Sequence, residues 1–128
     1  MSTRAQIRII EDGHEAIDLY HHSDGYFDGV GQELTYALAG AQTAGDFMSN
    51  LATFGDDYEE TDVLHYDIEY FYMLDFTRKR FFGFHTRRPV WPEDADISQD
   101  GDLAPHTDGP VLDLATGEEL SEEEYLHR

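Results

Sequence analysis

The sequence predicts an α+β fold, in which two β-hairpins form an antiparallel sheet and one or two helices are inserted between them. Three observations predict it. Residues 3–10 alternate between apolar and polar side chains, residues 30–51 repeat apolar side chains every three or four positions, and residues 63–76 alternate again with many aromatics. An acidic C-terminal tail with a short terminal helix completes the prediction.

The first hairpin lies at the N-terminus. In residues 3–10 the apolar side chains share one face, and Gln6 and Arg8 lie on the other, which predicts a strand with one face in solvent. Asp12-Gly13 follows, and this dipeptide is a strong signal for a two-residue hairpin turn. Residues 16–22 are therefore expected to return as the second strand.

The helical segment comes next. The spacing of apolar residues in 30–51 is that of an amphipathic helix. Two glycines inside this run lower its helix propensity. The segment is therefore either one helix or two, the first ending near Thr43 and the second covering about 46–54. The acidic stretch 55–62 is expected to be a connection.

The second hairpin follows this connection. Residues 63–76 are rich in Tyr and Phe and place most of their aromatic side chains on one face, which predicts a long strand. Residues 77–80 would turn the chain, and residues 81–86 would return as the fourth strand.

The tail begins where two prolines interrupt the chain, which divides it into a domain at 1–88 and a tail at 89–128. Near its end, Ser121 and Glu124 form a capping-box pattern that predicts a short helix. The tail could stay solvated or pair with a basic cluster just before it. That cluster consists of Arg78, Lys79, Arg80, Arg87 and Arg88.

Charge excludes several classes of partner. The 128 residues hold 28 Asp and Glu against 8 Lys and Arg, for a net charge of −20. A nucleic-acid ligand or an anionic membrane would need cations on the protein, so neither is expected.

The chain has no cysteine, no apolar run of 18 residues and no signal peptide at its start, which predicts a cytoplasmic protein. A host with high internal salt or a GC-rich genome could also produce this composition.

One loop gathers residues that could bind a ligand. His21, His22, Asp24 and Tyr26 lie around an Asp-Gly turn. His65 and Asp67 could join them if their strands are neighbours, but the spacing matches no metal motif. Residues 94–105 resemble a calcium loop only superficially, since the sixth and twelfth positions are wrong. We identify no catalytic set, metal or cofactor, and we do not expect an enzyme.

Four separated segments carry a resemblance to a known family. They are Ser-Thr-Arg-Ala-Gln-Ile at 2–7, Tyr-His-His-Ser-Asp-Gly-Tyr at 20–26, Gly-Val-Gly at 29–31 and Asp-Ile-Glu-Tyr-Phe-Tyr at 67–72. Together they resemble a family of small uncharacterised proteins of tailed phages and prophages. The resemblance implies a phage-type origin and assigns no activity.

Charge and resemblance together predict a binding protein that inhibits a host protein, such as a nucleic-acid-binding defence complex, by mimicking nucleic acid, as an anti-CRISPR protein would. Alternatives are a small-ligand or metal-binding protein centred on residues 21–26, and an acidic accessory protein adapted to high salt. The carboxylates expected to face the partner are Asp56, Asp57, Glu59, Glu60, Asp62, Glu93, Asp94, Asp96, Asp100 and Asp102.

Overall fold

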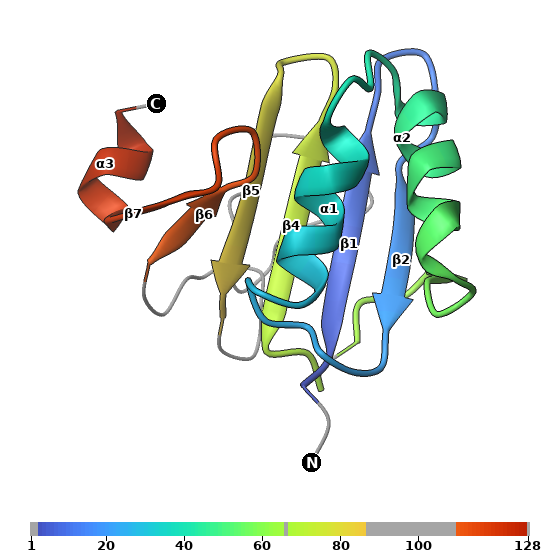
Figure 1. Cartoon of the computed structure of the whole chain (residues 1–128), viewed down its shortest axis with the longest axis horizontal. Coiled ribbons are helices and arrows are strands. Elements are labelled where there is room, and N and C mark those ends of the chain that lie inside the picture. The colour runs from blue at the N-terminus through green and yellow to red at the C-terminus, as the bar shows by residue number, and fades with distance from the viewer. Residues whose placement is uncertain (1–2, 66, 87–109, 128) are drawn as a thin grey trace.

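A computed structural model describes residues 3–65, 67–86 and 110–127, which build a seven-stranded sheet with helices on it (Figure 1). The strand order is β3-β2-β1-β4-β5-β6-β7. The strands are β1 (Ala5–Ile10), β2 (Ile17–His21), β3 (Glu59–Thr61), β4 (Tyr70–Asp75), β5 (Arg80–His85), β6 (Val111–Asp113) and β7 (Glu118–Leu120). The helices are α1 (Val30–Leu38), α2 (Ala44–Leu51), the short 3₁₀ helix η1 (Ala52–Phe54) and α3 (Glu122–Leu126).

The α+β class and both hairpins are confirmed, because β1 pairs with β2 and β4 pairs with β5 in antiparallel fashion. The expected two-residue turn at Asp12-Gly13 was wrong, since residues 11–16 connect β1 to β2. One pairing differs from the expected antiparallel sheet: β1 and β4 are parallel neighbours. Parallel strands need a long crossover connection. Here β2, both inserted helices and β3 all lie between β1 and β4 in the chain, so the second hairpin can return in the direction of β1.

The inserted segment forms two helices on one face of the sheet (Figure 1). Between them Gly40 adopts φ +78°, and the Thr43 hydroxyl caps α2 by accepting a hydrogen bond from the Asp46 amide at 3.1 Å. Side chains of both helices pack with odd-numbered residues of β1. The fully or almost fully buried members of this core include Ala5, Ile7, Ile9, Leu34, Phe47, Leu51, Tyr72 and Leu74.

The opposite face of the sheet carries a second core. It contains Tyr20, Ile68, Phe71, Phe82, Phe84, Val111 and Leu120, with Tyr125 of α3 packed against it. As a result all six residues of β1 are buried, and the expectation that Gln6 and Arg8 face solvent was wrong. Alternation shows which side chains share a face, but it cannot show that a polar face is covered.

Several boundaries differ from those predicted in the middle of the chain. α1 ends at Leu38 rather than near Thr43. β4 begins at Tyr70, while Ile68 enters the second core from a non-strand segment. The expected connection at 55–62 contains β3, which pairs antiparallel with β2. The sequence of β3 is short and charged, so it lacks the alternation that marks a strand.

Residues 110–127 extend the sheet beyond β5. β6 pairs with β5, β7 pairs with β6, and α3 begins with the predicted capping box of Ser121 and Glu124. The acidic tail predicted from residue 89 therefore contains two strands of the same sheet and the terminal helix.

Candidate functional site

Exposed carboxylates are concentrated at one edge of the sheet. We call Asp56, Asp57, Glu59, Glu60 and Asp62 the acidic edge. All five are exposed, and they lie in or beside β3, which is the terminal strand of the sheet. These are five of the ten carboxylates that the sequence predicted to face a partner. The other five, Glu93, Asp94, Asp96, Asp100 and Asp102, lie outside the described residues.

A half-buried tyrosine anchors the acidic edge. The hydroxyl of Tyr58 donates a hydrogen bond to Glu33 of α1 at 2.7 Å, and its ring lies 4.6 Å from that of His21. Burial, reinforced by the Glu33 carboxylate, raises the pKa of Tyr58 well above its usual value. Because Tyr58 points inward, the carboxylates on either side of it are held at the surface.

The charge of the acidic edge is not neutralised by Lys or Arg anywhere in the described part of the chain. The Nε2 atom of His22 lies 3.2 Å from the Glu59 carboxylate. Arg4 pairs with Asp67 at 3.3 Å, and Arg78 pairs with Asp75 at 2.9 Å. The described arginines that form ion pairs thus compensate carboxylates elsewhere, and the edge keeps its negative potential.

The other end of the sheet is also acidic. Glu118 and Glu119 of β7 are exposed, as are Glu59 and Glu60 of β3. Charged side chains on terminal strands prevent sheets of two molecules from pairing edge to edge. This protection accounts for part of the acidity at both edges.

The structure does not bring the predicted loop residues into one site. His21 is buried beside Tyr58, whereas His22 is exposed and contacts Glu59. Successive side chains leave a strand on opposite faces, so the two histidines diverge. Tyr26, which is exposed, donates a hydrogen bond to Asp24 at 3.0 Å.

The backbone of this loop has a structural role. The Val30 amide donates to the carbonyl of Asp24 at 2.8 Å, and the Gly25 amide donates to that of Thr3 at 2.9 Å. From β4 in the sheet, the buried hydroxyl of Tyr72 donates a hydrogen bond to the Gly25 carbonyl at 2.6 Å. These bonds fix the start of α1 against the sheet.

His65 and Asp67 do meet His22, but around a tyrosine. The Tyr20 ring stacks on His65 at 3.9 Å and meets His22 edge-on at 4.6 Å, while its hydroxyl donates to Asp67 at 2.8–2.9 Å. Within residues 3–65, 67–86 and 110–127, no group of three or more His, Cys, Asp and Glu side chains is placed to hold a metal ion.

A buried polar network links β1 to the segment after β3. Gln6 donates to Asp18 at 2.6 Å and to the carbonyl of Val63 at 3.2 Å, and accepts from the His65 amide at 3.0 Å. Arg8 forms an ion pair with Asp18 at 3.0 Å. Burial raises the pKa of Asp18, although Arg8 and Gln6 both oppose that shift.

The raised pKa of Asp18 predicts an unusual pH dependence. As the pH rises, the Asp18 carboxyl loses its proton near its ordinary pKa of 3.8 in the unfolded chain, but only at a higher pH in the folded protein. The contribution of Asp18 to the free energy of unfolding therefore falls as the pH rises through its folded-state pKa. We expect the free energy of unfolding of the wild type, minus that of Asp18→Asn, to decrease as the pH rises above 3.8. Urea unfolding followed by circular dichroism measures both. A difference that increases with pH would contradict this assignment.

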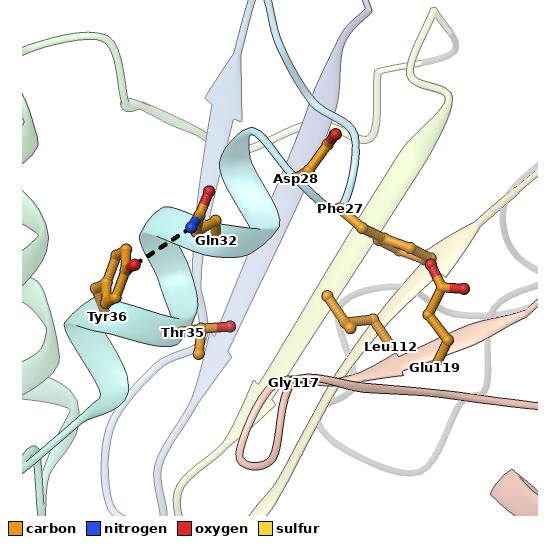
Figure 2. A pocket seen from close by; sticks show the side chains of 8 residues that line it. All are labelled: Phe27, Asp28, Gln32, Thr35, Tyr36, Leu112, Gly117 and Glu119. Atoms are coloured by element: carbon orange, nitrogen blue, oxygen red, sulfur yellow. Dashed lines mark hydrogen bonds between the residues drawn. The ribbon is translucent and has the colours of Figure 1, made fainter.

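The sequence did not reveal a groove between α1 and the β6–β7 hairpin, with a volume of about 460 Å³ (Figure 2). Its apolar lining includes Phe27 and Leu112. Its polar lining includes Asp28, Gln32, Thr35, Tyr36 and Glu119. Nothing in the local sequence signals this groove, because its walls are about 80 residues apart in the chain.

Comparison with known proteins adds no relative. The chain matches no protein-family model, no curated protein and no solved structure. The resemblance to phage proteins therefore stays a prediction. None of the helices in the described ranges is long and apolar enough to cross a membrane.

Proposed function

We propose that this protein inhibits a host nucleic-acid-binding protein by occupying its basic surface with the acidic edge, as expected of a phage-encoded anti-defence protein of the anti-CRISPR type. The observation that carries the proposal is the set of five exposed carboxylates at the β3 end of the sheet, without an ion pair to Lys or Arg among the described residues.

Electrostatics explains why such an edge suits a nucleic-acid-binding surface. A protein that binds nucleic acid presents Lys and Arg to the phosphates and releases condensed counterions when it binds. Carboxylates held in and beside a terminal strand can be matched by the same cations. Association driven in this way is fast, and it weakens as salt screens the charges.

The geometry favours this proposal over a small-ligand site at the 21–26 loop. There, Asp24 and Tyr26 bond to each other, and His21 is buried against Tyr58. The groups that would have to contact a ligand are thus already engaged or separated. Edge protection explains carboxylates on β3 and β7, but it does not explain Asp56, Asp57 and Asp62, which lie outside β3.

The proposal is tested by competition. The tagged protein is used to capture a partner from nuclease-treated host lysate, and the purified partner is mixed with a fluorescent nucleic acid that it binds. We expect this protein to displace the nucleic acid at a stoichiometric ratio, and less effectively as the salt concentration rises. A ternary complex that retains both the nucleic acid and this protein would contradict the proposal.

A further inference from the structure

The groove between α1 and the β6–β7 hairpin is a preformed feature of the fold. The Phe27 ring packs edge-on against Tyr70 at 5.2 Å and Tyr72 at 6.3 Å. α1 lies so close to β6 that a Cβ atom at Gly31 would be 3.1 Å from the Leu112 side chain. In Figure 2, Thr35 and Leu112 point into the space between helix and hairpin, and Phe27 extends toward Glu119.

The polar groups around the groove offer hydrogen-bond acceptors. Asp28 and Glu119 are exposed carboxylates. Thr35 donates its hydroxyl proton to the carbonyl of Gly31 at 2.9 Å, and Gln32 donates its amide to Tyr36 at 3.2 Å, so each keeps an oxygen that can accept. The lining contributed by described residues contains no cationic side chain.

The charges of Asp28 and Glu119 also act on Tyr70, whose ring packs against Phe27. Burial is the main cause of the raised pKa of Tyr70, and the charges of Glu69, Asp28 and Glu119 add to it. Asp28 and Glu119, which are distant in the chain, therefore act on one side chain that packs against Phe27. Tyr36, with 60% of its surface exposed, adds an aromatic face at the rim.

We propose that this groove binds an arginine side chain of the partner protein. The aliphatic stem would lie along the apolar wall that Phe27 and Leu112 contribute, and the guanidinium group would contact the Glu119 carboxylate with the Phe27 ring beside it. Arginine fits better than lysine because its planar group has five donors and stacks on aromatic rings, whereas an ammonium is a compact and strongly hydrated charge. The inference rests on the proposed function, since a nucleic-acid-binding surface supplies exposed arginines.

The test is a titration of the ¹⁵N-labelled full chain with N-acetyl-argininamide, followed by NMR. We expect saturable shifts of the Gly31, Thr35, Gly117 and Glu119 amides, with weaker binding of the lysine analogue and none of the neutral citrulline analogue. Glu119→Gln should weaken arginine binding about tenfold, because a charged hydrogen-bond partner is lost. Glu123→Gln is the matched control, since Glu123 is exposed on α3 and lies outside the groove, and it should change nothing.

The groove site would be overturned if the amide shifts were spread over all acidic surfaces and did not saturate. It would also be overturned if Glu119→Gln and Glu123→Gln had equal effects on the affinity for N-acetyl-argininamide. Because the ligand is a small amide, this result is independent of the competition experiment. If the protein displaces nucleic acid from its partner but does not bind N-acetyl-argininamide, the groove site is refuted and the proposed function is not. Arginine binding in a protein that cannot displace nucleic acid would refute the proposed function and, with it, the assignment of the groove to that partner.

Discussion

Replacing Phe47 with alanine should lower the free energy of unfolding by about 3–5 kcal/mol. Phe47 is fully buried in the core between the helices and the sheet, and its ring centre lies 5.8 Å from that of Phe76. Removing the ring loses the free energy gained by burying a large apolar side chain. It also leaves a cavity that the sheet on one side and the helix on the other cannot close.

Urea unfolding followed by circular dichroism measures this loss, with Ser49→Ala as the control on the same helix. Ser49 is exposed, so its replacement should change stability by less than about 0.5 kcal/mol. Equal effects of the two substitutions would show that α2 does not pack on the sheet as the structure describes.

Gly29→Ala should be similarly disruptive, at about 3 kcal/mol, the upper end for adding a methyl group to a packed site. A Cβ atom at this position would lie 2.1 Å from the carbonyl oxygen of Asp24. That oxygen accepts the hydrogen bond from the Val30 amide, so the loop must open and the start of α1 must move.

The matched control is Gly45→Ala within α2. A Cβ atom there has its nearest contact at 3.7 Å, with the Thr43 hydroxyl. Since alanine is the better helix former, this variant should gain up to about 1 kcal/mol. Thermal unfolding of both variants gives the comparison, and a stable Gly29→Ala protein would refute the loop conformation.

The parts of the fold that were predictable are those determined within a few residues. Asp12-Gly13 marks the place of the first hairpin, although not the length of its loop, and the capping box at Ser121 begins α3. In each case a short stretch of chain satisfies its own backbone groups, so the signal is present in the local sequence.

The parts that could not be predicted depend on distant segments. The parallel pairing of β1 with β4 and the addition of β6 to β5 are set by contacts far apart in the chain. Gln6 was assigned to solvent because its partners at Val63 and His65 are almost 60 residues away. The acidic residues of 56–62 were predicted as a group, but their position in and beside a terminal strand was not, because it depends on the pairing of β3 with β2.

The central claim is that the acidic edge, rather than overall charge, binds the partner. It is tested most directly by the dissociation constant of the captured partner for two variants that each lose four negative charges. One carries Asp56→Asn, Asp57→Asn, Glu60→Gln and Asp62→Asn. The other carries Asp12→Asn, Glu15→Gln, Glu69→Gln and Glu123→Gln, which are exposed elsewhere.

At physiological salt, charges more than about 8 Å from the interface are largely screened. We therefore expect the edge variant to bind at least about tenfold more weakly and with a shallower salt dependence, and the control variant to bind within about twofold of the wild type. Equal losses in both variants would mean that net charge alone attracts the partner, and an edge variant that binds like the wild type would contradict the proposed interface.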